Sequence, residues 1–387
     1  MSFKPLFSRA LGLAPKRLHF AAHSHHLWPD ASFDAHERAW LEANEHADRK
    51  WDLIFGEVVP TAQAEVAKEL NLPSPDSVVF SPNTHDFLIR LHSGVERRPV
   101  RILSTDGEFH SFRRQGERWE EAGQAVIQRI AAKPFGDFAD RFIAAAKAGD
   151  HDIILISQVF FRTGRTFDRM AELAALARPE GPWVVIDGYH GFMAQPTDLS
   201  DVADRVFYLA GGYKYAMSGE GAGFLHAPPG FCPRPVVTGW FAEFGDLSGP
   251  PGGVQYRADG GRFWGATSDF TALYRFNGVR RMLAEAELTT ADVSAHAHGL
   301  MQTFQQAVGD GLAGRLAEAV LLNPFNGDPA RARFLAFRHP DAADWKARLM
   351  KADIVTDVRD DVVRFGFGLY QDADDVERLI KACAQAL

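Results

Sequence analysis

The sequence has few cysteines and no long apolar run. Its 387 residues include two cysteines, Cys232 and Cys383, which is too few for a disulfide framework or a thiolate metal site and favours a reducing cytoplasm. No apolar stretch approaches the ~20 residues that span a bilayer, and charged residues interrupt the N-terminal segment where a secretory signal would be apolar. We therefore expect a cytoplasmic protein that makes no membrane contact.

The chain also lacks an excess of positive charge. It carries 42 Lys and Arg against 50 Asp and Glu, a formal net charge of −8, so no basic surplus is available to neutralise the phosphates of a nucleic acid. Hydrophobic residues make up 46% and charged residues 24%, as in an ordinary globular protein. The length suits one large domain with a smaller companion.

Short apolar runs alternate with helical stretches over the first two thirds of the chain. This alternation predicts an α/β fold, with a mostly parallel sheet covered by helices on both faces. After about residue 245 the pattern changes to that of a smaller α+β unit. We expect an N-terminal arm (1–30), a large domain (31–270) and a small domain (271–387). The strand-like runs are residues 77–80, 100–103, 125–127, 152–156, 183–186 and 206–209.

A lysine and an aspartate follow two consecutive predicted strands. Lys214 lies in a glycine-rich segment just after one run, and Asp187 ends the run before it. Parallel strands end at the same edge of a sheet, where ligands of such folds bind. A pyridoxal phosphate site needs this pair of residue types. The lysine holds the cofactor aldehyde as an imine, and the carboxylate keeps the pyridine nitrogen protonated.

Other polar and aromatic candidates also follow predicted strands. Asn83 and Thr84 precede a helical segment whose free N–H groups would favour a phosphate. Phe109 could stack on a flat ring, Gln158 lies at a strand end, and His190 could donate to the cofactor or face the substrate. Taken singly, each is equally explained as a helix cap, a turn residue or a core residue.

Two other kinds of site are disfavoured. The N-terminal run that contains His23, His25 and His26 has no accompanying cluster of Asp, Glu or Cys with ligand spacing, so we expect no metal and interpret the run as a loop that lines the pocket. The glycine-rich pieces do not form G-x-G-x-x-G after the first strand, which argues against a dinucleotide-binding fold.

The ordered set of motifs resembles the kynureninase family, within the class V aminotransferase group of fold-type-I pyridoxal phosphate enzymes. The resemblance covers roughly residues 71–387. It rests on five motifs: a Q-V segment ending in T-G-x-x-x-D (157–168), a D-x-x-H element (187–190), a G-Y-K-Y lysine motif (212–215), the start of a G-W-W/F-G-H motif (239–241) and an R-x-x-x-x-L-Y segment (364–370).

The resemblance implies a large domain with a mostly parallel seven-stranded sheet between helices, a small C-terminal α+β domain, and a homodimer with its active site at the subunit boundary. Lys214, Asp187 and His190 would be the catalytic residues, and Arg364 would clamp the substrate α-carboxylate. Further contacts to the cofactor would come from Asn83, Thr84, Phe109, Gln158 and Tyr213, and from Thr267 across the dimer interface. Further contacts to the substrate would come from His23, Ser24 and Trp240.

The chain departs from the family on the substrate side. The family's N-terminal G-N-S-L-G element is replaced by residues 22–26, which keep Ser24, and the motif that begins at Trp240 lacks its final histidine. We therefore expect a pyridoxal phosphate enzyme that acts on an α-amino acid through Lys214. A kynureninase-like hydrolase that cleaves Cβ–Cγ and an aminotransferase that uses a 2-oxo acid both stay open. A cysteine desulfurase or lyase and a non-catalytic cofactor-binding protein are less favoured.

Overall fold

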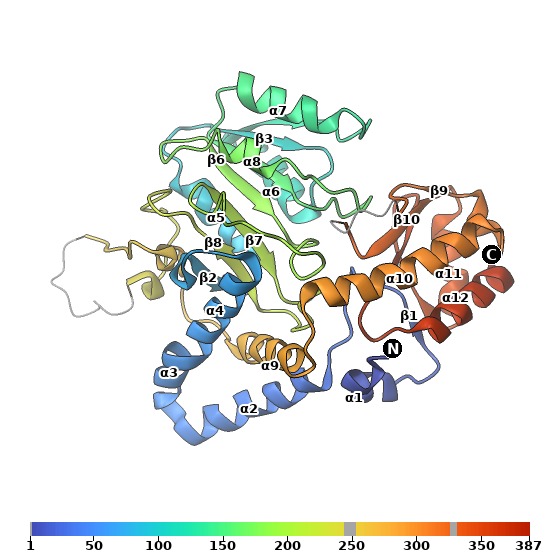
Figure 1. Cartoon of the computed structure of the whole chain (residues 1–387). Helices are drawn as coiled ribbons and strands as arrows, with labels where there is room; N and C mark the ends of the chain where they lie inside the picture. The colour runs from blue at the N-terminus through green and yellow to red at the C-terminus, as the bar shows by residue number, and fades with distance from the viewer. Residues whose placement is uncertain (1, 244–252, 326–330) are drawn as a thin grey trace.

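A seven-stranded sheet forms the centre of the larger lobe (Figure 1) in the computed structural model, which describes residues 2–243, 253–325 and 331–387. The strand order is β2-β8-β7-β6-β5-β3-β4, and only β8 runs antiparallel to its neighbours. This confirms the predicted α/β fold. The strands are β2 (Val78–Ser81), β3 (Val100–Thr105), β4 (Ala125–Ile130), β5 (Ile153–Ser157), β6 (Trp183–Asp187), β7 (Val206–Gly211) and β8 (Gly223–His226).

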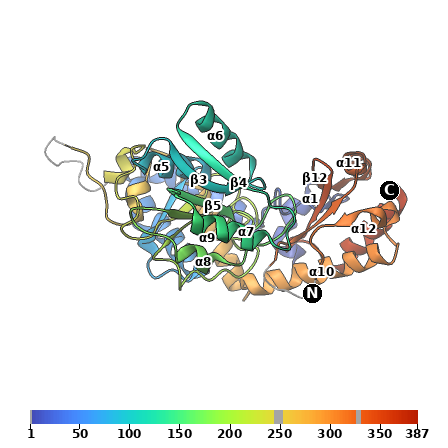
Figure 2. The same cartoon turned by 90° about the horizontal axis from the view of Figure 1, so that it is seen from above.

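Helices cover both faces of this sheet, because its central strands are apolar on both sides. Every residue of β5 and β7 is buried, as expected for a parallel sheet between two helical layers. Figure 2 shows α5 and α6 on one face and α7 and α8 on the other. The helices of this lobe include α2 (Asp30–His46), α4 (Val59–Leu70), α5 (Thr84–Gly94), α6 (His110–Glu121), α7 (Phe138–Ala148), α8 (Met170–Ala174) and α9 (Thr271–Glu285).

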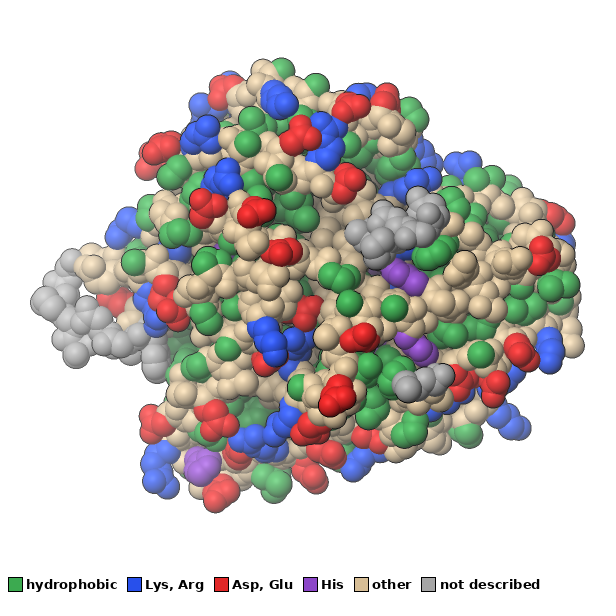
Figure 3. All heavy atoms as spheres, viewed as in Figure 1, with side chains coloured by type: hydrophobic (Ala, Val, Ile, Leu, Met, Phe, Trp, Pro, Cys, Tyr) green, Lys and Arg blue, Asp and Glu red, His purple; other side chains and the backbone are tan. Residues whose placement is uncertain are grey.

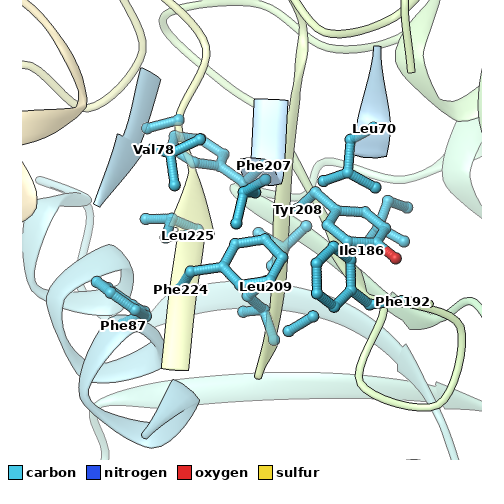
Figure 4. Packing of buried hydrophobic residues seen from close by; sticks show 14 of the residues in the cluster. Leu70, Val78, Phe87, Ile186, Phe192, Phe207, Tyr208, Leu209, Phe224 and Leu225 are labelled. Carbon is cyan, nitrogen blue, oxygen red and sulfur yellow. The ribbon is translucent and has the colours of Figure 1, made fainter. Parts of the chain in front are cut away.

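Aromatic packing fixes the ends of β7 and β8. The rings of Phe192 and Phe224 meet edge to face with centroids 4.7 Å apart, and Tyr208 of β7 lies beside Phe224 (Figure 4). Such pairs add about 0.5–1.5 kcal/mol to the gain from burying their surface. The turn that follows β7, which carries Lys214, therefore starts from a rigid strand end.

The smaller lobe has its own sheet and its own hydrophobic core. The antiparallel order is β12-β13-β10-β9, and Trp345 is completely buried in this core. Figure 1 shows α10 running from the larger lobe along the smaller one. The elements are α10 (Thr290–Gly309), β9 (Val320–Leu321), β10 (Phe334–Arg338), α11 (Ala342–Lys351), β12 (Asp357–Arg359), β13 (Val362–Gly366) and α12 (Ala373–Ala386).

The two cores divide within α10 and not at residue 270. Met282 and Leu283 of α9 and Val293 of α10 belong to the core of the larger lobe, whereas Ala297 belongs to the core of the smaller lobe. Helix α9 lies against α2 and α4 and so completes the larger lobe. The domain limits given above remain a prediction, but the packing puts the first helix assigned to the small domain with the large one.

The N-terminal arm packs on the smaller lobe. Its strand β1 (Leu18–His19) pairs in parallel with β11 (Ile354–Val355), and Ala21 forms a bridge to Gly366 at the end of β13. A Cβ at Gly366 would lie 2.1 Å from Nδ1 of His23, so glycine is required for this close approach. The arm thereby carries His23 between the lobes.

Basic and acidic side chains are mixed over the face seen in Figure 3. In the part of the chain that the structure describes, no helix combines the length and apolar character needed to cross a bilayer.

Candidate active site

A cavity of about 210 Å³ lies at the C-terminal edge of the large sheet. It brings together residues that are far apart in the sequence and that come from the ends of different elements. Seven predicted site residues line it, namely Asn83, Thr84, Phe109, Asp187, His190, Tyr213 and Lys214. These seven residues therefore lie together at one edge of the sheet, as expected from their positions at strand ends.

Lys214 is buried in the wall of this cavity. Its Nζ lies 2.9 Å from Nε2 and 3.1 Å from Nδ1 of His190 and 4.9 Å from the centre of the Tyr189 ring. Burial lowers the pKa of the amine to about 7, although the carboxylate of Asp187 acts in the opposite direction. A substantial fraction of the amine is therefore neutral near pH 7 and can act as a nucleophile or a base.

His190 is held neutral beside that amine. Burial, followed by the positive charge of Lys214, keeps the pKa of His190 well below 6.5. A neutral imidazole can accept a hydrogen bond from the amine of Lys214. His190 therefore orients the amine without adding a charge to the cavity.

Asp187 ends β6 directly beside Leu209 of β7. Its Oδ1 accepts a hydrogen bond from the backbone N–H of Tyr189 at 2.9 Å, and within the described residues Oδ2 makes no hydrogen bond. Burial raises the pKa of the carboxyl, and the charge of Lys214 opposes that rise. A cation placed in the cavity would keep Asp187 ionised.

The N-terminus of α5 forms one end of the cavity. Asn83 caps the helix by accepting from the backbone N–H of Asp86 at 3.2 Å, and Ser81 donates to the carboxylate of Asp86 at 2.7 Å. Thr84 and His85, in the first turn, line the cavity. Free backbone N–H groups and the helix dipole at this end favour an anion such as a phosphate.

Aromatic rings form the walls. Phe109, at the start of α6, meets Phe161 edge to face with centroids 5.3 Å apart, and its ring lies 5.4 Å from Nζ of Lys214. Tyr189 and Tyr213 pack together on another side, with centroids 5.5 Å apart. These walls suit a flat, partly apolar ligand.

Residues of the smaller lobe and the arm lie on the substrate side. Arg364 of β13 is almost fully buried, donates from Nη1 to the carbonyl of Phe161 and forms an ion pair with Asp357. His23 stacks on Phe334 with centroids 4.6 Å apart, and neither of its ring nitrogens has a hydrogen-bond partner within the described residues. The charge of Arg364 lowers the pKa values of Lys214 and His190, and the charges of Arg364, His190 and Lys214 lower the pKa of His23, so these side chains belong to the same site.

Six predicted site residues do not line this cavity; Arg364 and His23 lie on its substrate side, and the other four lie elsewhere. Gln158 is buried behind the cavity, where its amide accepts from Tyr208 at 2.8 Å and donates to Thr197 at 3.0 Å. Trp240 donates from its indole to Thr267 at 3.1 Å, and both are exposed. Ser24 lies in a turn of the arm, with its backbone N–H on the carbonyl of Ala21. The roles assigned to these residues by resemblance remain predictions.

Several residues that the structure brings to the site were not predicted from the sequence. Ser157 and Tyr189 line the cavity, and Asp357 and Arg359 lie next to Arg364. Ser157 could have been found from strand alternation, because it is the last residue of β5. The two residues of β12 belong to no motif that we identified.

Glu108 is a further buried acid, directly beneath the site. Its carboxylate accepts from Thr105 at 2.7 Å and from the hydroxyl of Ser157 at 2.5 Å. Burial raises the pKa of Glu108 to about 7, despite these hydrogen bonds. The side chain fixes the position of Ser157 at the cavity wall.

This shifted pKa predicts a pH-dependent stability. The folded chain holds the Glu108 proton up to about pH 7 and the unfolded chain releases it near 4.5, so the stabilisation from this proton is full below 4.5 and is lost as the pH rises through 7. The variant Glu108→Gln carries a neutral amide at this position, so its free energy of unfolding does not depend on this proton. Its free energy of unfolding relative to wild type should rise by up to about 3 kcal/mol between pH 5 and pH 8, as measured by urea denaturation without cofactor. An equal difference at both pH values would contradict the raised pKa.

The N-terminal histidines do not converge on one point. His19 bonds to the Tyr370 hydroxyl at 2.7 Å, His26 to the carbonyl of Leu27 at 2.6 Å, and His25 is near Glu220. Across residues 2–243, 253–325 and 331–387, no group of three or more His, Cys, Asp or Glu side chains is arranged to hold a metal ion.

The cavity fits pyridoxal phosphate in chemistry. It contains a buried amine with a pKa of about 7 for the aldehyde, a carboxylate with one oxygen free of protein hydrogen bonds for the ring nitrogen, an aromatic side chain for the ring face and a helix N-terminus for the phosphate. The Nδ1 of His85, in the first turn of that helix, is buried without a partner in the described chain, which leaves it for a ligand.

Two known proteins with similar sequences have names that describe different activities. The family model of the kynureninase C-terminal domain matches residues 293–383. A kynureninase of Deinococcus radiodurans is 29% identical over 251 residues, 62% of this chain and 57% of that protein. An isopenicillin N epimerase of Streptomyces clavuligerus is 30% identical over 158 residues, 40% of this chain and 39% of that protein. The chain thus matches about half of the length of these relatives or less.

A solved structure agrees over the whole chain. C-DES, with glycine covalently linked to its pyridoxal phosphate cofactor, superposes with a TM-score of 0.80 at 16% identity and covers 100% of both chains. In another structure the same protein is named a cystine C–S lyase. The chain is therefore similar in sequence to kynureninases over part of its length, and it has the fold of C-DES, a pyridoxal phosphate enzyme.

Proposed function

We propose that this enzyme cleaves the Cβ–Cγ bond of a kynurenine-type α-amino acid by hydrolysis. One observation carries the proposal. Lys214, with a pKa lowered to about 7, lies in the same cavity as Asp187 and Phe109, with Arg364 of the kynureninase-like segment nearby. An amine in this state can take a proton from carbon near neutral pH.

The cofactor would be held by residues whose positions are described above. The α5 N-terminus with Asn83 and Thr84 would bind its phosphate, Phe109 would cover its ring, and Asp187 and Lys214 would meet its ring nitrogen and its aldehyde carbon. When bound, pyridoxal phosphate supplies an aldehyde that condenses with amines and a ring that accepts electrons from the substrate's Cα.

The chain's own residues provide binding, orientation and proton transfer. Arg364 would orient the substrate by its α-carboxylate, since a guanidinium pairs with a planar anion through two hydrogen bonds. The Nζ of Lys214 would remove the Cα proton, and His190 would keep that amine in position. Lys214, His190 and Arg364 are themselves buried, and water weakens charged contacts less at buried positions.

An aminotransferase is the second candidate, because the chain departs from the kynureninase pattern at the substrate wall. His23 is buried next to Arg364 and His190, where the family has a small-residue segment, and Trp240 is followed by Phe241, Ala242 and Glu243. These residues would recognise a different side chain, and the amino group would then pass to a 2-oxo acid.

A cysteine desulfurase is the less favoured alternative. Such enzymes attack with a thiolate, yet Cys383 is completely buried and Cys232 is 1% exposed. Burial raises the pKa of both thiols to about 12. Neither cysteine lines the cavity.

Incubation of the holoenzyme with L-kynurenine tests the proposal directly. Hydrolysis adds one water and releases anthranilate and alanine, so both products should form without any 2-oxo acid. The variant Lys214→Ala is the matched negative control. Product formation that requires a 2-oxo acid would favour the aminotransferase, and no reaction in either case would refute kynurenine as substrate.

Arg364→Ala should weaken substrate binding and spare cofactor binding. The loss of a charged, two-point contact costs about 1.5–3 kcal/mol, so KM should rise roughly 10- to 100-fold. The retained cofactor is measured by absorbance after dialysis. Arg338→Ala, on the neighbouring strand β10, is the control and should change neither quantity. Loss of cofactor from the Arg364 variant would contradict the carboxylate role.

We also propose a cytoplasmic homodimer. Trp240 is 41% exposed and bonds to Thr267 outside the cavity of its own chain, which suits a contribution to the site of a second copy. The two free cysteines suit a reducing compartment. Sedimentation of the holoenzyme should give twice the mass of one chain, and a monomer with full activity would refute the shared site.

A further inference from the structure

The two terminal nitrogens of Arg364 are engaged within the protein, whereas its buried Nε has no hydrogen-bond partner in the described chain. Its Nη2 donates to Oδ2 of Asp357, and its Nη1 donates to the carbonyl of Phe161. Asp357 faces Arg364 across the β12–β13 pair and is 7% exposed. An internal carboxylate therefore holds the guanidinium that the family uses for the substrate's carboxylate.

Asp357 has a second partner. Its Oδ1 accepts from Nη1 of Arg359 at 2.7 Å, and Arg359, two residues along the same short strand, is about one third exposed. One carboxylate is thus shared between two arginines. We call Asp357, Arg359 and Arg364 the Arg–Asp–Arg cluster.

The Arg–Asp–Arg cluster carries one unbalanced positive charge. Within the described chain Arg359 and Arg364 form ion pairs with Asp357 alone. His23 lies 3.8 Å from Asp357, but burial keeps its pKa well below 6.5, so it adds no charge. Arg364 and Asp357 are buried whereas Arg359 is partly exposed, so the excess charge is only partly solvated, and one additional carboxylate would balance it.

We propose that a substrate carboxylate exchanges with Asp357 on Arg364, while Asp357 remains bound to Arg359. This inference rests on the proposed function, in which Arg364 binds the α-carboxylate. With the substrate bound, two arginines face two carboxylates. Asp357 then sets specificity, because a ligand without a carboxylate cannot displace it.

Arg359 is the positioning residue in this exchange. It holds Asp357 through the oxygen that Arg364 does not use, so Asp357 keeps a charged partner after it leaves Arg364. Without Arg359 the displaced carboxylate would be buried unpaired, and the exchange would become unfavourable.

Two ligands distinguish the contribution of the carboxylate to binding from that of the rest of the substrate. 2-Methylalanine has no α-proton and is not turned over, and isopropylamine is the same molecule without its carboxylate. Their dissociation constants for the holoenzyme are measured by calorimetry. Asp357→Asn should bind 2-methylalanine about 10-fold tighter or better, because a charged competitor is removed. Isopropylamine should change less than about 2-fold, because it does not reach Arg364.

The exchange also predicts a non-additive pair of variants. Arg359→Met should weaken 2-methylalanine binding about 10-fold, and the double variant with Asp357→Asn should recover it, since the two residues act on one equilibrium. Unchanged or weaker binding of 2-methylalanine to Asp357→Asn would overturn the proposal. Equal affinity of the wild type for the two ligands would instead refute the role of Arg364 in the proposed function.

Discussion

Replacing Lys214 by alanine should reduce turnover by at least about 10³-fold and leave the fold intact. The substitution removes both the amine that meets the cofactor aldehyde and the base for the Cα proton, and a positioned base alone is worth about 10²–10⁴-fold. The fold should persist, because among the described residues the side chain is hydrogen-bonded to His190 alone, and Tyr208 of the preceding strand β7 stacks on Phe224. Circular dichroism and the melting temperature check this second part.

The site of covalent attachment gives a readout that does not depend on turnover. After reduction of the wild-type holoenzyme with borohydride, mass spectrometry should find the cofactor on the peptide that contains Lys214. Lys147→Ala, at an exposed position on α7, is the control and should retain both attachment and activity. Cofactor found on another lysine, or wild-type turnover by Lys214→Ala, would show that the site is wrongly assigned.

Asp187→Asn should reduce turnover by about 10²- to 10³-fold. Removal of one partner from a buried charge pair costs about 3–5 kcal/mol, and each 1.36 kcal/mol is a factor of ten in rate. Asparagine has nearly the same shape and can still accept from the backbone N–H of Tyr189, so the turn after β6 should be kept. The effect therefore isolates the negative charge.

A second turn in the chain supplies the control for this variant. Asp198 accepts from the backbone N–H of Ser200 at 2.9 Å, the same two-residue arrangement as Asp187 and Tyr189, but at an exposed position away from the cavity. Asp198→Asn should therefore leave turnover and cofactor retention unchanged. If Asp187→Asn also left turnover and cofactor retention unchanged, the role of Asp187 would be limited to capping the turn.

The central strands could be predicted because their chemistry is unambiguous. Residues 153–156 and 183–186 are apolar without interruption, which a strand buried on both faces requires. Strand β8 was missed. It has four residues, begins with Gly223 and has only Phe224 and Leu225 as large apolar side chains, so its position depends on its two neighbours and not on its own sequence.

The site was predictable where it depends on strand ends and less so where it depends on side-chain direction. Ser157 and Gln158 are adjacent, and successive side chains along an extended chain point to opposite sides. One faces the cavity and the other bonds to Thr197 and Tyr208. Asp357 and Arg359 were missed because the contact with Arg364 arises from the pairing of β12 with β13, which no local pattern of a three-residue strand reveals.

The pairing of β1 with β11 has a consequence for protein synthesis. Leu18 leaves the ribosome well before its partner Ile354, because the whole large sheet is encoded between them. The arm that carries His23 must therefore wait, unpaired, while the large sheet folds, since domains form in the order in which they are made. A nascent chain thus assembles the strands that carry Asp187 and precede Lys214 before β11 has been made to hold the arm on the substrate side.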